Sequence, residues 1–230
     1  MSGSIWGALL LQTGDWHFVL QNLDYLAGGL ALTIELTIVG ILLGFLTGFP
    51  AGIVEVYGTQ WLRKPVRIVG TVLRGTPLVV ILIFAYFVFP IGSAFLAAVL
   101  GLGLRSGAYQ SQIFRGALGS IDEGQMEAAR SIGMSRFEAI RHVIVPQALR
   151  RSMPGFQNEF TIVLKDTSLA IAIGFAELLT RTQYLFIQQT TAVLELILFV
   201  SAIYFVLTFA TNRALDRLES KFAIPDGDSS

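Results

Sequence analysis

The sequence contains no cysteine and only two histidines, His17 and His142, among its 230 residues. The lack of cysteine excludes disulfides, thiolate metal sites and a cysteine nucleophile. The two histidines lie far apart and no H-E-x-x-H motif occurs, so a histidine metal centre or a catalytic triad has too few residues to form. We expect no catalytic residue, no metal site and no cofactor bound by this chain.

A phosphate-binding loop is missing as well. None of the three lysines, Lys64, Lys165 and Lys221, belongs to a G-x-x-x-x-G-K-S/T motif. That motif is the P-loop, whose backbone N–H groups cradle the phosphates of ATP. The chain therefore cannot bind ATP by a P-loop.

Charged residues are scarce. They make up 14% of the sequence, whereas soluble domains contain about a quarter. Hydrophobic residues make up 53% and the mean hydropathy is +0.66, which indicates a membrane protein in contact with lipid. Sixteen basic and sixteen acidic residues cancel, so no overall field favours nucleic acid as a partner.

Long apolar stretches dominate the remaining sequence. A membrane-spanning helix needs about 20 apolar residues, and four stretches are this long: residues 28–54, 75–104, 154–180 and 183–212. The second exceeds one span and is interrupted by FPIGS at 89–93, where we expect a turn. The sequence therefore predicts an all-α polytopic membrane protein with about five transmembrane helices.

Basic residues indicate which connections face the cytoplasm, because cytoplasmic loops collect lysine and arginine. They cluster at residues 63–67, 115–151 and 213–221, after the first, third and fifth predicted spans, and only Arg181 falls on the opposite side. We therefore expect the N-terminus outside and the C-terminus in the cytoplasm. The chain then divides into an extracytoplasmic or interfacial segment at 1–26, a transmembrane domain at 27–215 and a cytoplasmic tail at 216–230.

A charged island at residues 120–151 lies between the third and fourth predicted spans. It contains two S-x-x-E patterns, SIDE at 120–123 and SRFE at 135–138. Such patterns are typical of capping boxes, in which serine and glutamate bond the free N–H groups of a helix start. They predict two short helices, with Gly133 at the turn between them and Pro146 ending the second.

The second predicted helix carries an apolar stripe of Phe137, Ile140 and Ile144, spaced as on one face of a helix. Amphipathicity alone favours packing of this stripe on the chain's own spans or on lipid headgroups. A docking surface for another protein is the alternative that periodicity leaves open.

The motifs of the island decide between these alternatives. EAA at 127–129 is followed by Gly133, Val143, Val145 and Pro146, a pattern that resembles the EAA loop of ABC importer permeases. Valine stands at two positions where the family usually has isoleucine and leucine. Further motifs resemble the polar amino-acid branch of that family: RGTP at 74–77, AY at 108–109, PQALRRSMPGFQN at 146–158 and LKDTSLA at 164–170.

The resemblance implies the transmembrane fold of a type I importer in the cytoplasmic membrane. It implies a second permease subunit, identical or a sister, together with two cytosolic ATPase subunits that bind ATP and magnesium, and an extracytoplasmic amino-acid-binding protein. Such an assembly imports a polar amino acid by alternating access. In this family the EAA loop is the coupling helix that docks in the ATPase, a role that the resemblance gives to Glu127, Ala128, Ala129, Arg130, Gly133, Ser135, Phe137 and Pro146.

Polar residues inside the predicted spans are candidates for the cargo pathway, because a charge in the bilayer is costly unless it is paired or faces water. The candidates inside the stretch at 154–180 are Glu159, Lys165, Asp166, Thr167 and Ser168. Three more come from the motifs that carry the resemblance: Arg74 from RGTP, and Tyr109 and Gln112 from AYQSQ at 108–112. Lys165 and Asp166 diverge by about 100° on a regular helix, so an unwound turn or two different partners is expected. These two residues either line the pathway or form an ion-pair lock with another subunit or another span, and both interpretations stay open.

The cargo is predicted only by class. Family members often have glutamate where this chain has Gln112, in AYQSQ at 108–112. The loss of that negative charge weakens the expectation of a cationic amino acid. External binding proteins generally set specificity in this family, so we predict a polar amino acid without naming it.

Two rival functions use parts of the same sequence. A passive channel or an ion-coupled secondary transporter acting as a dimer has the same spans, but it has no need of two capped cytoplasmic helices. An intramembrane hydrolase is disfavoured because GLRSG at 103–107 provides no partnered base for Ser106.

Four glycines, Gly40, Gly44, Gly48 and Gly52, follow one another at every fourth position of the first predicted span. Small residues at this spacing share one helix face and allow a second helix to approach closely. We interpret this glycine stripe as scaffold rather than as part of a site.

Overall fold

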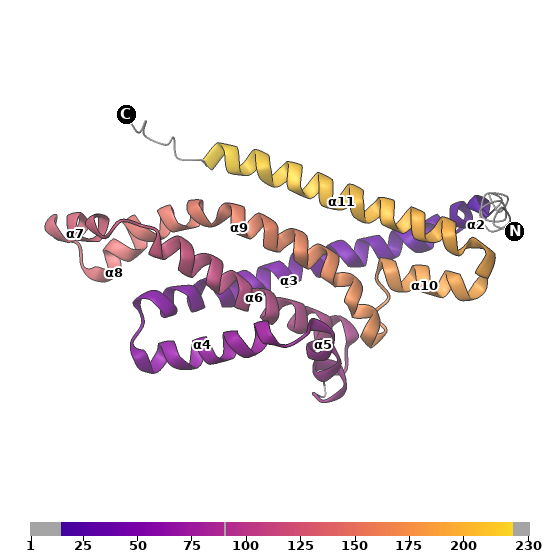
Figure 1. The fold of residues 1–230 in the computed structure, drawn as a ribbon, viewed down its shortest axis with the longest axis horizontal. Coiled ribbons are helices and arrows are strands. Elements are labelled where there is room, and N and C mark those ends of the chain that lie inside the picture. The colour runs from indigo at the N-terminus through magenta and orange to yellow at the C-terminus, as the bar shows by residue number, and fades with distance from the viewer. Residues whose placement is uncertain (1–14, 90, 223–230) are drawn as a thin grey trace, which may run out of the picture.

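Every regular element of the computed structural model is helical within residues 15–89 and 91–222, the part of the chain that it describes (Figure 1). In chain order the elements are α2 (Trp16–Gln21), α3 (Leu23–Tyr57), α4 (Gln60–Gly75), α5 (Leu78–Phe87), α6 (Ala94–Gly119), α7 (Glu123–Ser131), α8 (Arg136–Ala139), the π-helical turn η1 (Ile140–Ile144), α9 (Val145–Asp166), the 3-10 segment η2 (Thr167–Ile173), α10 (Leu178–Gln188), the 3-10 turn η3 (Thr190–Ala192) and α11 (Val193–Phe222). The all-α prediction is confirmed.

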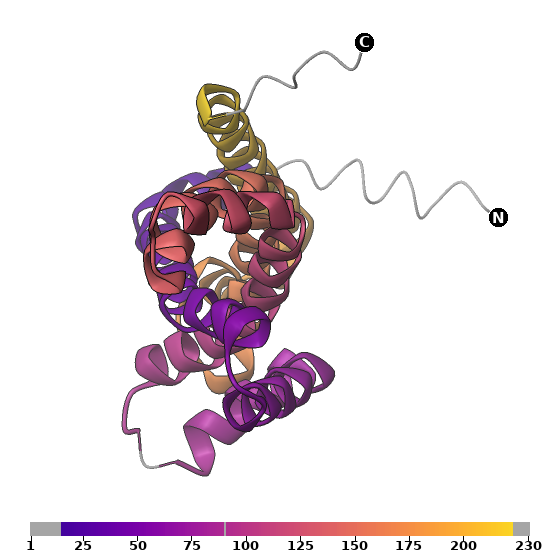
Figure 2. The same cartoon turned by 90° about the vertical axis from the view of Figure 1, so that its left-hand side faces the viewer.

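The long helices α3, α6, α9 and α11 run roughly along the longest axis of the molecule (Figure 1). Helices α7 and α8 lie at one end of this bundle, and α2 and α10 lie at the other. Seen from the α7 end, α3, α6 and α9 pack against one another, while α4 and α5 lie to one side (Figure 2). The bundle therefore has two distinct ends joined by continuous helices.

The contact between α3 and α6 is the most extensive between any two described helices, and glycine makes it possible. A Cβ atom on Gly48 would lie 2.5 Å from the carbonyl oxygen of Gly107, and one on Gly52 would lie 2.8 Å from Cβ of Phe114. Only glycine fits where the backbones approach this closely. The close packing predicted for the glycine stripe is confirmed.

The sequence predicts a span that begins at residue 75, but the structure differs there. Helix α4 continues to Gly75 and packs along α6, and the chain then bends by 104° into α5. Pro77 causes the bend, because its ring excludes the helical conformation at the preceding residue, and Thr76 is extended with ψ of 130°. Helix α5 has 10 residues, about 15 Å in length, which is too short to cross a bilayer alone.

Two segments of the described chain, Leu23–Tyr57 and Thr190–Arg217, are long and apolar enough to cross a membrane, and α4 with α5 forms a third candidate as one bent pair. Helices α6 and α9, with 26 and 22 residues, have sufficient length but carry more polar side chains. By length and composition the structure therefore provides two or three spans. The count of five and the orientation in the membrane stay predictions.

The sequence predicts an interfacial segment at residues 1–26 and a cytoplasmic tail at residues 216–230. Helix α3 begins at Leu23, inside the segment 1–26 that we expected to be interfacial, and residues 1–14 lie outside the described part. Helix α11 continues without a break to Phe222, as expected of a last span that extends beyond the membrane. Residues 223–230 of the predicted tail are also outside the described part.

Candidate functional site

Helix α7 begins at a different residue from the predicted one. Asp122 is its N-cap, and Oδ1 of Asp122 accepts a hydrogen bond from the N–H of Gly124 at 2.7 Å. Ser120 instead ends α6, where its hydroxyl donates to the carbonyl of Ala117 at 2.8 Å. The capping box predicted from SIDE is therefore wrong, because α6 extends to Gly119 and uses the serine, while aspartate caps a helix equally well.

The turn after α7 depends on Gly133, as the sequence predicts. Its φ of +92° lies in the left-handed region, which glycine adopts without steric cost. The N–H of Gly133 bonds the carbonyl of Arg130 at 3.0 Å, and the N–H of Met134 bonds that of Ala129 at 3.2 Å. These bonds satisfy carbonyl groups at the helix end and allow the chain to reverse at once into α8.

Helix α8 begins with the capping box predicted from SRFE. Oγ of Ser135 accepts the N–H of Glu138 at 3.3 Å, and Oε2 of Glu138 accepts the N–H of Ser135 at 2.7 Å. The bonds from the backbone and the hydroxyl of Ser135 hold the pKa of the exposed Glu138 carboxyl below its ordinary value. Because folding favours the charged carboxylate, the cap is complete above the ordinary pKa and is lost as the pH falls through the lowered one.

The prediction that Pro146 ends the second helix is wrong. One π-helical turn, Ile140–Ile144, joins α8 to α9, and Pro146 lies in the first turn of α9. In the π turn the N–H of Val145 bonds the carbonyl of Ile140, five residues back. Proline is tolerated directly after such a junction, because N–H groups of a first helical turn do not need a partner in the regular ladder. The chain is thus helical without interruption from α8 through α9.

The residues of the predicted apolar stripe differ in exposure on the two sides of this junction. Ile144 is 2% exposed and packs inside the bundle, whereas Phe137 is 69% exposed and Ile132, beside the Gly133 turn, is 76% exposed. Glu127, Ala128 and Arg130 are also exposed. We refer to Glu127, Ala128, Arg130, Ile132 and Phe137 as the α7–α8 surface, which combines apolar side chains with both signs of charge.

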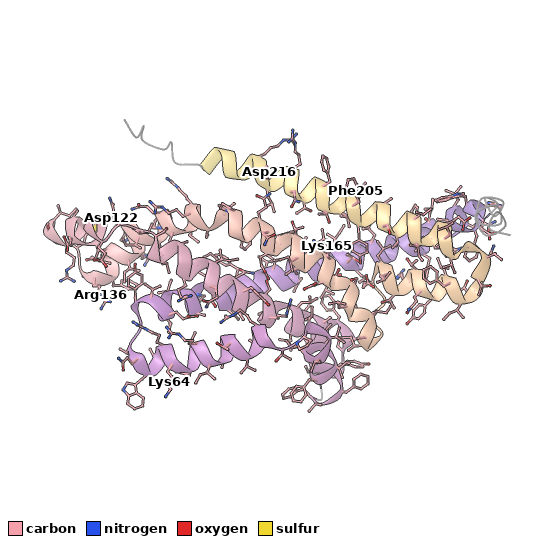
Figure 3. The ribbon with its side chains drawn as sticks, viewed as in Figure 1. Lys64, Asp122, Arg136, Lys165, Phe205 and Asp216 are labelled. Carbon is pink, nitrogen blue, oxygen red and sulfur yellow. The ribbon has the colours of Figure 1, made fainter. Side chains whose placement is uncertain are left out.

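A cleft of about 350 Å³ lies beside this surface. Its walls come from the end of α3, the end of α6, α7 and the start of α8, and include Tyr57, Asp122, Glu127 and Arg136. Asp122 and Arg136 lie at this end of the bundle (Figure 3). The end of the molecule therefore offers a protruding helix pair next to a recess, which is a suitable shape for docking another protein.

Within the bundle, Asp166 forms an ion pair between two helices, which is one of the two roles that the sequence leaves open for Lys165 and Asp166. Oδ2 of Asp166 accepts a hydrogen bond from Nη1 of Arg105 on α6 at 2.9 Å, and the Lys165 side chain is exposed. The predicted unwinding is present, because α9 ends at Asp166 and the chain continues as a 3-10 segment. The hydroxyls of Thr167 and Ser168 donate to the carbonyls of Leu164 and Lys165, both at 2.7 Å.

Two more predicted residues join Arg105 in one row. The Arg105 guanidinium lies over the Tyr109 ring at 5.0 Å from its centroid. The Tyr109 hydroxyl donates to the carbonyl of Arg74 at 3.4 Å, and Nη1 of Arg74 donates to the carbonyl of Ala108 at 2.7 Å. This row ties the end of α4, next to the 104° bend, to the ion pair between α6 and α9.

Residues 40–224 match the family described as the binding-protein-dependent transport system inner membrane component. This match covers most of the chain. The chain belongs to this family. It is the permease subunit of an ABC importer of the inner membrane, and the motif that binds ATP is missing from its own sequence.

Several known proteins are similar to this permease over nearly its whole length. The glutamine transport system permease protein GlnP of Escherichia coli (strain K12) is 38% identical, with 91% of this permease and 98% of GlnP covered. The L-cystine transport system permease protein TcyB of Bacillus subtilis (strain 168) is 33% identical, with 93% and 97% covered. A solved amino acid ABC transporter crystallised with histidines is 32% identical and superimposes with a TM-score of 0.82, covering 91% of this permease and 99% of that chain.

Glu159 of the permease, another predicted pathway residue, is buried between α6 and α9. It is 4% exposed, and its Oε1 accepts a hydrogen bond from the Ser106 hydroxyl at 2.8 Å. Gln110 continues this network with bonds from its Nε2 to Oγ of Ser106 at 3.1 Å and to the carbonyl of Ile41 at 3.3 Å. Glu159 therefore joins α9 to α6 and, through Gln110, to α3.

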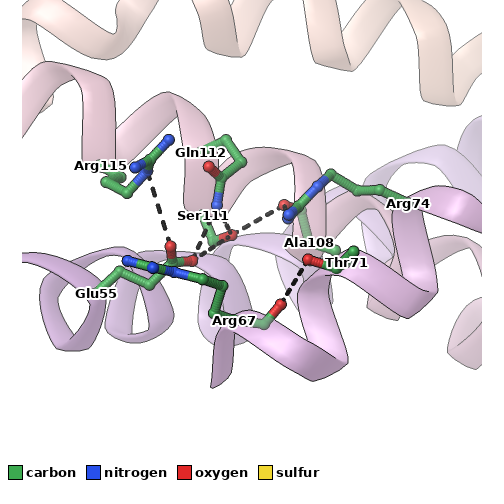
Figure 4. Close-up of polar contacts among 8 residues, drawn as sticks. All are labelled: Glu55, Arg67, Thr71, Arg74, Ala108, Ser111, Gln112 and Arg115. Atoms are coloured by element: carbon green, nitrogen blue, oxygen red, sulfur yellow. Dashed lines mark hydrogen bonds and ion pairs between the residues drawn. The ribbon is translucent and has the colours of Figure 1, made fainter. Parts of the chain in front are cut away.

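Gln112 of the permease contacts Glu55, a residue that was not among the sequence-based candidates. Its Nε2 donates to Oε1 of Glu55 at 2.9 Å, Ser111 donates to the same oxygen at 3.5 Å, and Nε of Arg115 lies 3.7 Å from Oε2 (Figure 4). The Glu55 side chain is only 2% exposed. A signal for it exists, because Glu55 lies three residues after Gly52 and so extends the glycine stripe that faces α6.

Proposed function

We propose that this permease imports a polar amino acid across the cytoplasmic membrane by alternating access. In this proposal it pairs with a second permease subunit, two ATPase subunits dock on the α7–α8 surface, and an external binding protein delivers the cargo to the opposite end. The names of two relatives support the cargo class, since GlnP is a glutamine permease and TcyB an L-cystine permease.

The proposed orientation places the α7–α8 end in the cytoplasm. Lys64, at the start of α4, and Arg136, at the start of α8, lie at this same end (Figure 3). Three more arginines, Arg130, Arg141 and Arg150, belong to the segment that forms it. Basic residues accumulate on the cytoplasmic side of membrane proteins, so the distribution of positive charge supports this orientation.

The observation that carries the proposal is the continuous helical path from the docking surface into the bundle. From Arg136 to Asp166 the chain runs through α8, η1 and α9 without a break, a distance of roughly 45 Å at 1.5 Å per residue. In this proposal a movement imposed on the α7–α8 surface is carried along this continuous helical path to the ion pair of Asp166 with Arg105. ATP binding drives transport if the ATPase holds one position of this element better than the other.

Charge reversal on the α7–α8 surface is expected to weaken docking of the ATPase and transport together. Glu127→Arg should lower copurification of the ATPase and ATP-driven uptake together by roughly tenfold or more. The substitution removes a charged contact with the ATPase, which is worth about 1.5–3 kcal/mol, and places a charge of the wrong sign at the interface. We would measure uptake of labelled L-glutamine and L-cystine into vesicles that contain the permease, its ATPase and its binding protein.

Arg213→Glu is the matched control for this charge reversal, since Arg213 is exposed on α11, outside the α7–α8 surface. It should leave ATPase binding and uptake close to the wild-type values. Unchanged ATPase binding by a folded Glu127→Arg protein would contradict the docking role. Uptake driven by an ion gradient in the absence of any ATPase would instead support the secondary transporter.

A further inference from the structure

One face of helix α4 is apolar and exposed. Trp61, Ile68 and Val72 are 90%, 54% and 60% exposed, and their spacing of seven and four residues places them on one side of a helix. Lys64, three positions after Trp61, lies on the same side, and it is exposed at the edge of the molecule (Figure 3). We refer to Trp61, Lys64, Ile68 and Val72 as the outer face of α4.

The outer face begins at the level of the membrane surface. Helix α3 is long and apolar enough to cross a membrane, and it ends at Tyr57. Only Gly58 and Thr59 separate it from the start of α4 at Gln60, so the first turn of α4 lies at the depth where α3 reaches water. Tryptophan is enriched at this level of membrane proteins. Trp61 is therefore placed where lipid headgroups lie.

The chain does not balance the positive charge around α4. No acidic residue occurs from position 56 to position 121, whereas six basic residues do: Arg63, Lys64, Arg67, Arg74, Arg105 and Arg115. Arg105 and Arg115 pair with carboxylates of other segments. Arg63 and Arg74 donate to backbone carbonyl groups. Lys64 and Arg67 are exposed, and their side chains have no hydrogen bond or ion pair within the part of the chain that the structure describes.

Lys64 and Arg67 are neighbours on the surface of α4, since positions three apart lie side by side on a helix. Like charges on neighbouring positions repel each other. The preceding carboxylate, Glu55, already accepts a hydrogen bond from Gln112 and pairs with Arg115. An anion bound between the two cations removes this repulsion. A phosphate diester suits both, because lysine offers three donors and arginine binds phosphate through two parallel N–H groups.

A second copy of this chain is a poor match for the outer face. Two-fold pairing brings the same surface of both copies together, so pairing through this face would set Lys64 and Arg67 against the same cations of the partner. The stretch from 56 to 121 contains no carboxylate to separate them. An anionic phospholipid has both complementary parts, since its acyl chains suit the apolar side chains and its phosphate suits the cations.

We propose that the outer face of α4, together with Arg67, is a docking surface for an anionic phospholipid. The lipid phosphate binds Lys64 and Arg67, and one acyl chain lies along Ile68 and Val72. Trp61 lies beside the headgroup. Binding of this lipid requires neither a particular cargo nor a particular orientation of the chain, because it depends only on the charge and exposure of α4 at the membrane surface.

Quenching of Trp61 fluorescence by brominated lipids tests this surface. The full chain carries Trp6→Phe and Trp16→Phe, so that Trp61 is the one tryptophan left of three. It is reconstituted in mixed bilayers of phosphatidylcholine and phosphatidylglycerol, with one of the two lipids brominated at a time. At equal mole fraction, phosphatidylglycerol should occupy the outer face about fivefold to thirtyfold more than phosphatidylcholine, the factor for one to two basic residues near a membrane surface. High salt should reduce this preference.

Charge removal at the two cations gives the decisive comparison. Lys64→Gln with Arg67→Gln should bring the preference close to one, whereas Lys64→Arg, which keeps the charge, should retain it. Arg213→Gln, the same exchange at an exposed position of α11, should leave the preference unchanged.

Three results would overturn the proposal. Equal quenching by the two lipids in the parent protein would show that the outer face has no preference for an anionic lipid. An equal loss of preference in Arg213→Gln would identify a diffuse charge effect instead of a docking surface. Quenching by neither lipid would mean that a second copy or another protein covers α4.

Discussion

Replacing Gly48 with alanine is expected to lower the melting temperature of the permease by about 5 °C or more. The added Cβ would lie 2.5 Å from the carbonyl oxygen of Gly107, 2.9 Å from Cβ of Gln110 and 3.1 Å from the N atom of Ser111. Two of these three atoms belong to the backbone of α6, which cannot rotate away, so the helices must separate. Overpacking of this kind costs about 1–3 kcal/mol, and 1 kcal/mol shifts the melting temperature by roughly 2–4 °C in a chain of this size.

Gly116→Ala supplies the opposite result as a control. Gly116 lies on α6, and apart from the adjacent backbone of α6 no described atom lies within 4 Å of the position that an added Cβ would take, so the methyl group enters open space. Alanine favours a helix over glycine by about 1 kcal/mol, and the melting temperature should rise slightly or stay constant. The measurement is thermal unfolding of purified protein in detergent. Equal stability of Gly48→Ala and the wild type would mean that α3 and α6 are not in direct backbone contact.

The glycine stripe shows how much of this fold the sequence can predict. The spacing of Gly44, Gly48 and Gly52 predicts a close contact, because it depends only on the geometry of one helix. The partner is α6, which meets the stripe with Gly107 and with the polar Gln110. The periodicity of α3 does not indicate which helix packs against the stripe, because tertiary packing determines the partner.

In the island at residues 120–151, predictions that depend on neighbouring residues alone are correct, and predictions that depend on an adjoining helix are wrong. Gly133 and the capping box at Ser135 were predicted correctly because a positive φ and a reciprocal cap involve neighbouring residues only. The assignments of Ser120 and Pro146 were wrong because each depends on a neighbouring element. Ser120 is used by the end of α6, and Pro146 follows a π turn that no propensity scale indicates.

Only part of the candidate pathway can be predicted from the sequence, because its contacts also depend on how separate helices pack. Asp166 is a candidate because it is a charged residue within an apolar stretch, and Tyr109 because it belongs to the AY motif; the structure brings both to Arg105. Arg105 lies just after an apolar stretch, but its partner Asp166 is 61 positions away along the chain. Long-range pairing of this kind follows from the packing of α6 on α9 and cannot be read from either helix alone.

Replacing Glu177 with glutamine is expected to destabilise the permease strongly while preserving its shape. Oε1 of Glu177 accepts the N–H of Thr180 at 2.7 Å, and Oε2 accepts the N–H of Leu179 at 2.9 Å and the hydroxyl of Tyr204 at 2.9 Å. Glutamine replaces one acceptor oxygen by an NH₂ group, which faces a backbone N–H that cannot turn away. Each unsatisfied buried donor costs about 1–3 kcal/mol, so we expect a fall in melting temperature of roughly 5–10 °C.

Two further variants show whether the backbone donors cause this loss. Tyr204→Phe removes one hydrogen bond but leaves Glu177 both of its backbone partners, so its effect should be small, about 1 kcal/mol. Glu127→Gln makes the same exchange at an exposed position of α7 and should not alter stability. If Tyr204→Phe were as damaging as Glu177→Gln, the carboxyl group would act mainly as an anchor for α11. The greater loss expected for Glu177→Gln instead makes it the N-cap that fixes the start of α10, since backbone donors, unlike a hydroxyl, have no second partner to turn to.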